Sequence, residues 1–183
     1  MFYILSEKEM SMETVFVNQT VLTKEVLYEY IKSISKKKVQ IIAAVAGILF
    51  ILLAVVEYSH GKVSSSVLSL FLGIVIFICP EFCFRFLANR FYKQQLTLNG
   101  GKEMQKTTKF LEDRIEVVTS NKAESSFQYE QISHIIETKN LIILKVDRQI
   151  YILLEKNNFS VGDSPSFLSF IRKACGSASM VKH

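Results

Sequence analysis

Few residues of this 183-residue chain have side chains that could act as nucleophiles or metal ligands. Cys79 and Cys83 are four residues apart, which would place both thiols on one face of a helix. Two thiols without a third ligand make a poor metal site, so we expect them to be small packing residues. His134 has no neighbouring cysteine or aspartate that would support catalysis. The HExxH, GxSxG, CxxC and phosphate-loop patterns are also missing from the sequence. We therefore predict no enzyme, with no catalytic, metal or cofactor-binding residue.

The acidic residues have conformational or anchoring explanations. Asp113, Asp147 and Asp163 all fall in expected turns, where aspartate is favoured for its local hydrogen bonds. Glu81 is more unusual because it lies near the end of an apolar run, and an acid within a membrane is by default a functional candidate. Arg85 follows four residues later, so the two side chains can pair at the level of the lipid headgroups. We predict an anchoring pair.

Two apolar runs dominate the organisation of the chain. Residues 39–56 carry no charge, and residues 63–84 carry only one acid before Arg85. Eighteen helical residues extend roughly 27 Å, close to the thickness of a bilayer's hydrocarbon core. Two such runs in tandem favour a pair of transmembrane helices over buried helices of a soluble protein. The connector, residues 57–62, is too short for anything but antiparallel neighbours, so we predict a membrane hairpin.

Basic residues flank the hairpin on both outer sides, whereas the connector contains a single lysine. Lysine and arginine are enriched in cytoplasmic segments next to transmembrane helices, so both termini are expected in the cytoplasm. The expected membrane-interface anchors are Lys36, Lys37, Lys38, Glu81, Arg85, Arg90 and Lys93. The basic excess beside the membrane can meet anionic lipid.

A stripe of small residues marks one face of the second apolar run. Ser66, Ser69 and Gly73 are spaced so that they share a helix face, and small residues let helices approach closely in lipid. We predict that this face packs against a helix and does not line a pore.

The N-terminal segment, residues 1–38, is expected to hold one strand and one amphipathic helix. Residues 13–21 alternate around Val15, Val17 and Gln19, which is typical of a strand. Thr23 can cap a helix that either lies at the membrane interface or continues into the first span. The first residues look atypical, and we hypothesise that translation starts at Met12.

Strand patterns dominate after the second span, and we expect a cytoplasmic domain over residues 94–176. Short turns separate six candidate strands, which predicts an antiparallel meander or half-barrel to which residues 13–21 return as a seventh strand. Ser164 as N-cap, Pro165 at the first helical position and Gly176 after the end predict one closing helix. The candidate strands are residues 105–111, 114–119, 125–130, 132–137, 141–146 and 149–155, and the tail, residues 177–183, is expected to be disordered.

This arrangement resembles the YcxB-like family of bacterial membrane proteins. The strand and helix before the hairpin carry the resemblance, together with Tyr129-Glu130-Gln131-Ile132 leading to Ile136-Glu137-Thr138. The chain departs from the family at Glu155-Lys156, where members often have Pro-Lys. The resemblance implies a C-terminal domain similar to pleckstrin-homology folds, which agrees with a meander closed by a helix. The family has no firmly assigned activity, so the resemblance supports architecture far more than function.

Composition narrows the possible partners. The net charge of +5 is not gathered into arginine-rich faces interleaved with aromatic residues, so no nucleic-acid partner is expected. We expect a membrane-anchored binding or regulatory module whose partners are the lipid bilayer and another membrane or cytoplasmic protein. The alternative is one subunit of a homo-oligomeric transport or channel component, since two helices cannot enclose a pore alone.

Overall fold

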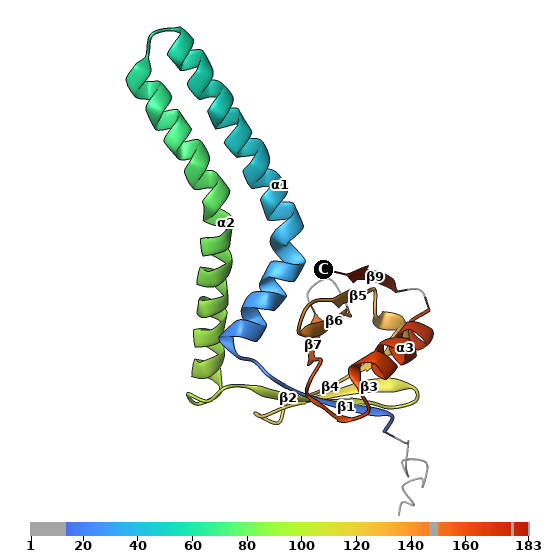
Figure 1. Cartoon of the computed structure of the whole chain (residues 1–183). Coiled ribbons are helices and arrows are strands. Elements are labelled where there is room, and N and C mark those ends of the chain that lie inside the picture. The colour runs from blue at the N-terminus through green and yellow to red at the C-terminus, as the bar shows by residue number, and fades with distance from the viewer. Residues whose placement is uncertain (1–13, 147–149, 177, 183) are drawn as a thin grey trace, which may run out of the picture. The chain divides into compact units, whose positions relative to one another are not determined.

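The computed structural model describes residues 14–146, 150–176 and 178–182 (Figure 1). The chain divides into two compact units. The hairpin unit is Thr23–Gln94, and the β-domain consists of the described residues up to Leu22 together with those from Gln95 onward. The N-terminal strand therefore belongs to the same unit as the C-terminal strands. The proposed start at Met12 lies outside the described residues.

The hairpin unit is built from two long helices, α1 (Lys24–Ser59) and α2 (Val63–Leu98). Thr23 caps α1, because its hydroxyl accepts a hydrogen bond of 3.2 Å from the backbone N–H of Val26. The expected amphipathic helix and the first apolar run form one continuous helix. Both helices extend beyond the apolar runs, and only residues 60–62 separate them.

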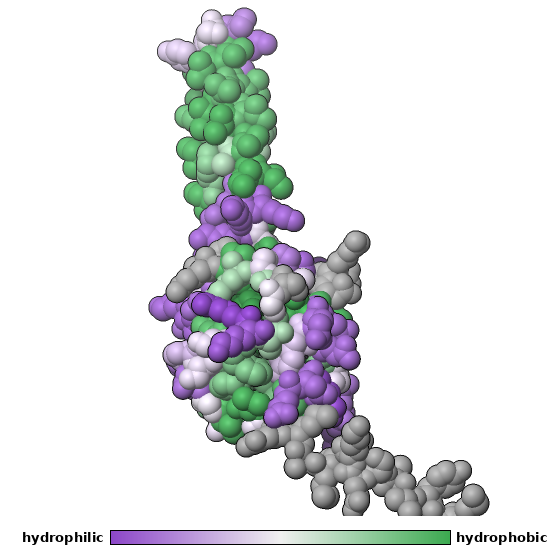
Figure 2. Space-filling view, turned by 90° about the vertical axis from the view of Figure 1, so that its right-hand side faces the viewer, coloured by the Kyte–Doolittle hydropathy of each residue, from purple (hydrophilic) through white to green (hydrophobic). Residues whose placement is uncertain are grey.

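The two helices are long and apolar enough to cross a membrane. Only 11% of the most apolar window of α1 and 22% of that of α2 is buried, unlike the core helices of a soluble protein. Figure 2 shows apolar surface along the hairpin, with hydrophilic groups at its tip and farther along it. Exposed apolar surface on this scale is unfavourable in water.

The first sheet of the β-domain has five strands in the order β4-β3-β2-β1-β8, all antiparallel (Figure 1). These strands are β1 (Phe16–Val21), β2 (Gln105–Phe110), β3 (Arg114–Thr119), β4 (Glu124–Gln128) and β8 (Phe159–Val161). The N-terminal strand returns to this sheet as predicted, pairing Val21 with Gln105 and Phe16 with Phe110. The hairpin is thus inserted between two adjacent strands of one sheet.

The second sheet has four strands in the order β7-β6-β5-β9. Its strands are β5 (His134–Glu137), β6 (Leu141–Lys145), β7 (Tyr151–Glu155) and β9 (Ser179–Lys182). The β9 strand is parallel to β5, whereas the other two pairs are antiparallel. The β6 strand is the centre of the core, because Leu141, Ile142, Ile143 and Leu144 are all fully buried.

Helix α3 (Ser164–Ala174) completes the core between the two sheets (Figure 1). Phe167 and Ile171 are fully buried and cluster with side chains of both sheets. The expected fold class is confirmed in its coarse form, as two long apolar helices joined to a mostly antiparallel β-domain with a C-terminal helix.

Four details of the prediction were wrong. The chain does not form one meander, because the 3₁₀ turn Tyr129–Gln131 carries it from the first sheet to the second. Residues 179–182, expected within a disordered tail, form β9, which pairs with β5. Asp163 replaces Ser164 as the cap of α3, because its side chain accepts a bond of 2.8 Å from the N–H of Ser166. The helix therefore begins at Ser164, so Pro165 is its second residue.

Candidate functional site

A polar cluster joins the two helices of the hairpin unit around Glu81. Its carboxylate accepts hydrogen bonds from the Tyr28 hydroxyl and from the Lys32 ammonium, the latter at 3.0 Å. Arg85, the partner expected from the sequence, lies farther away, with 3.9 Å between its Nε and a Glu81 oxygen. The Arg85 guanidinium also lies over the Tyr28 ring, 5.6 Å from its centroid. Glu81 therefore connects α1 to α2 as well as pairing within α2.

Sequence reasoning missed Tyr28 and Lys32, although their spacing of four residues on α1 was visible. This spacing alone was not enough, because it does not reveal which turn of α2 faces the two side chains. The other expected anchors are exposed and are not brought into this cluster: Lys36, Lys37, Lys38, Arg90 and Lys93.

The small-residue stripe of α2 faces α1. Ser66 donates a hydrogen bond of 2.8 Å to the Ala54 carbonyl, and Ser69 donates one of 2.7 Å to the Glu57 carboxylate. A methyl group added at Gly73 would lie 3.3 Å from the Gly47 carbonyl oxygen, so the backbones approach closely there. The three residues contact the other helix of the same hairpin.

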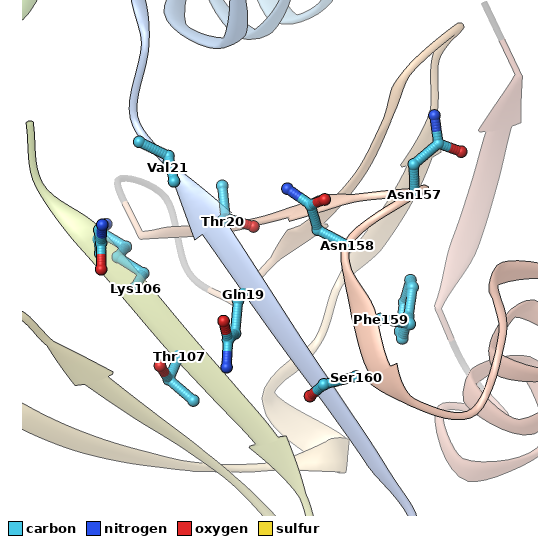
Figure 3. A pocket seen from close by; sticks show the side chains of 10 residues that line it. Gln19, Thr20, Val21, Lys106, Thr107, Asn157, Asn158, Phe159 and Ser160 are labelled. Atoms are coloured by element: carbon cyan, nitrogen blue, oxygen red, sulfur yellow. The ribbon is translucent and has the colours of Figure 1, made fainter.

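A recess of the β-domain lies along β1, β2 and the turn before β8, so it is lined by residues from both ends of the chain (Figure 3). This cleft has a volume of about 370 Å³ and is lined by Gln19, Thr20, Val21, Gln105, Lys106, Thr107, Asn157, Asn158, Phe159 and Ser160. Amide and hydroxyl groups dominate the lining. We take this cleft as the candidate ligand site.

A set of largely buried hydrogen bonds from Asn18, Thr20 and Glu155, here called the polar seam, holds β1 beside the cleft. Asn18 is fully buried, and its amide donates a hydrogen bond of 2.8 Å to the Glu155 carbonyl. The Thr20 hydroxyl lies 2.8 Å from the Asn18 side-chain oxygen and 2.9 Å from the Leu153 carbonyl. The Glu155 carboxylate accepts from the N–H of Val21 at 3.0 Å. These contacts attach a strand of the first sheet to β7 of the second.

Lys106 has a core-facing place in β2. It is two residues before Thr108 and four before Phe110, and both of these are buried. Burial lowers the pKa of the Lys106 ammonium from its ordinary value. No acceptor contacts this ammonium among the described residues, and the buried hydroxyl of Thr108 likewise lacks a partner there.

Two ionisable side chains of the β-domain, Cys175 and Tyr129, are buried in its core. Burial raises the pKa of the Cys175 thiol to about 11, so it is protonated at neutral pH. Burial likewise raises the pKa of Tyr129, whose hydroxyl donates a hydrogen bond of 2.6 Å to the Leu111 carbonyl. Within the described ranges, His, Cys, Asp and Glu form no group of three or more that could hold a metal ion.

Replacing Thr20 with valine should open the seam. The change leaves the Leu153 carbonyl and the Glu155 N–H buried without their side-chain partner, which costs about 1–3 kcal/mol. Hydrogen exchange of the β1 and β7 amides, followed by mass spectrometry in the full chain, should accelerate by about 5-fold to 150-fold. Thr107→Val is the matched control because its half-buried hydroxyl has no such contacts. Equal exchange in the two variants would contradict the role of the seam.

Comparison with known proteins gave one family match, which lies within the β-domain. Residues 110–171 match the family described as YcxB-like protein. That segment runs from the end of β2 to the last turns of α3. Neither the curated proteins nor the solved structures gave a match to the chain. The YcxB-like resemblance predicted from the sequence is therefore confirmed over residues 110–171.

Proposed function

We propose that this protein is a multi-pass protein of the bacterial cell membrane whose β-domain acts as a cytoplasmic binding or regulatory module without catalysis. One observation carries the membrane assignment: large apolar side chains are exposed along both helices. Ile42, Leu49 and Phe71 are 69%, 60% and 61% exposed. A bilayer would cover this surface, and the basic residues beyond it suit the cytoplasmic side. Both termini are then cytoplasmic, and a pleckstrin-homology-like fold for the β-domain agrees with two sheets closed by α3.

The connection between hairpin and β-domain supports a module that is tethered at two adjacent points. The N–H of Leu22 donates a hydrogen bond of 2.9 Å to the Met104 carbonyl, so the chain enters and leaves the β-domain on neighbouring strands. A partner bound by the β-domain would thereby be recruited to the membrane surface.

The exposed edge of the first sheet is the proposed protein-binding surface. Strand β4 ends that sheet, and Glu124, Ser125 and Ser126 are exposed. An edge strand offers unpaired backbone groups to which an extended peptide can add. This surface is separate from the cleft, whose nearest strand, β2, is two strands away from β4.

The homo-oligomeric transport component remains the alternative proposal. In the simplest form of this alternative, the stripe of Ser69 and Gly73 would mediate self-association. These residues contact α1 of the same chain. Oligomers would therefore need another helix face, so we favour the binding module.

Membrane insertion and topology can be tested together by single-cysteine labelling in intact cells. In a chain with Cys79, Cys83 and Cys175 replaced by alanine, Lys62→Cys lies in the connector and Asn121→Cys lies in an exposed turn of the β-domain. A membrane-impermeant maleimide should label Lys62→Cys directly and Asn121→Cys only after permeabilisation. Release of the protein by alkaline carbonate, or the reverse labelling pattern, would contradict the proposed insertion.

Partner binding requires purification from native membranes in a gentle detergent, with native mass spectrometry of the eluate. A partner present in near-equal amount should be lost in Ser126→Lys, which places a charge on the exposed edge, and retained in Lys109→Met. A pure homo-oligomer would instead favour the transport alternative.

A further inference from the structure

A recess between the two helices of the hairpin unit, here called the interhelical groove, lies just beyond the second apolar run. It has a volume of about 330 Å³ and is lined by Lys24, Glu25, Tyr28, Arg85, Ala88 and Asn89. Arg85, Ala88 and Asn89 are three to four residues apart on α2, so they share one face of that helix. Lys24 and Tyr28 are one turn apart on α1, so the two helices supply facing walls.

Both cations of the interhelical groove lie over aromatic rings of the opposite helix. The Arg85 guanidinium is 5.6 Å from the centroid of the Tyr28 ring, so it reaches from α2 to α1. The Lys24 ammonium is 5.3 Å from the centroid of the Tyr92 ring, so it reaches from α1 to α2. Cation–π contacts of this kind orient a cation without neutralising it. The two charges therefore converge on the groove from its two walls.

The neighbouring carboxylates leave the groove with a positive charge. Glu81 accepts from the Lys32 ammonium at 3.0 Å, whereas the Arg85 Nε is 3.9 Å from its nearest carboxylate oxygen, so Lys32 is the principal partner of Glu81. Glu25 also lines the groove, but it forms no ion pair with Lys24 or Arg85 among the described residues. The lining thus carries two positive charges and one negative charge.

The groove lies at the depth of the lipid headgroups if the hairpin spans the membrane as proposed. The second apolar run ends at Phe84, and the segment from Arg85 to Asn89 rises about 6 Å along α2. The headgroup layer of one leaflet is about 5–7 Å thick. A phospholipid headgroup is therefore the molecule that meets this groove.

We propose that the interhelical groove binds the headgroup of an anionic phospholipid whose phosphate bears a hydroxylated substituent, as in phosphatidylglycerol. The phosphate oxygens would accept charge-assisted hydrogen bonds from Arg85 and Lys24, both of which have long side chains. The substituent's hydroxyls would donate to the Glu25 carboxylate, and the Asn89 amide can both donate and accept. The single negative charge of this headgroup balances the net charge of the lining, whereas a zwitterionic headgroup does not. This inference rests on the membrane insertion proposed above.

The test titrates phospholipids into the delipidated full chain in a gentle detergent and counts bound lipid by native mass spectrometry. Phosphatidylglycerol should bind at least about tenfold more tightly than phosphatidylcholine or phosphatidylethanolamine. Arg85→Gln should weaken the binding of phosphatidylglycerol by about tenfold, because a charge-assisted hydrogen bond is lost. Arg90→Gln is the matched control, since Arg90 is an exposed arginine of the same helix that does not line the groove.

A second pair of variants tests the other wall and guards against misfolding of the first. Lys24→Gln should weaken the binding of phosphatidylglycerol several-fold, whereas Lys37→Gln, at an exposed position of α1 outside the groove, should not. The proposal is overturned if the three lipids bind equally, or if neither groove variant binds phosphatidylglycerol more weakly than its control. Such a result in a chain that resists alkaline carbonate would refute the lipid site alone, whereas release by carbonate would refute the insertion itself.

Discussion

A chain in which an Asn-Gly turn replaces residues 23–103 should fold as a water-soluble β-domain, whereas residues 104–183 alone should not fold cooperatively. Leu22 and Met104 are opposed at the ends of β1 and β2, with the N–H of the first bonded to the carbonyl of the second. That is the position at which a two-residue type I′ turn closes an antiparallel pair. The hairpin can therefore be removed without stretching either strand.

The loss of β1 would be severe because this strand lies between two others. It pairs with β2 on one side and β8 on the other, and it contributes the buried side chains Phe16 and Asn18. Residues 104–183 would leave β2 and β8 without their shared neighbour and open the core around Phe110. Far-UV circular dichroism and urea unfolding of both fragments give the measurement. A cooperative transition of similar midpoint in both would show that β1 is dispensable.

Strand β1 shows how far sequence reasoning reached. Alternation predicted a strand that returns to the sheet, and both points are confirmed. The alternating residues that suggested the strand do not form its buried face, because Val17 and Gln19 are more exposed than Asn18 and Thr20. Asn18 and Thr20 can face inward because their polar atoms bond to β7 across the core. Those bonds join residues more than 130 positions apart, and no local pattern encodes them.

The two missed strands have a similar explanation. The β8 strand is only three residues long, and β9 follows Gly176 closely and itself begins with a serine. Such segments carry no hydrophobic periodicity, and their pairing depends on partners that are already folded. The apolar hairpin was predictable because its signal is compositional, extending over 18 residues or more. The cleft was not, since β1 and the turn at Asn157 meet only in the folded domain.

Phe167→Ala should be the most damaging single substitution in the core of the β-domain, costing about 3–5 kcal/mol. The Phe167 ring is fully buried, and its centroid lies 4.6 Å from that of Phe110 and 5.5 Å from that of Phe16. It lies 5.2 Å from Phe159 as well, so one side chain of α3 contacts β1, β2 and β8. Truncation removes these aromatic contacts and leaves a cavity that the rigid sheets cannot close.

Urea unfolding of the hairpin-free chain measures this cost, with Leu168→Ala as the matched control. Leu168 is the next residue of α3 but is only half-buried, so about 1 kcal/mol is expected there. Equal costs would mean that α3 lies on the surface of the β-domain. A much larger cost at Phe167 would show that α3 fills the core between the sheets, and the strand that precedes the hairpin would then depend on the C-terminal helix for its packing.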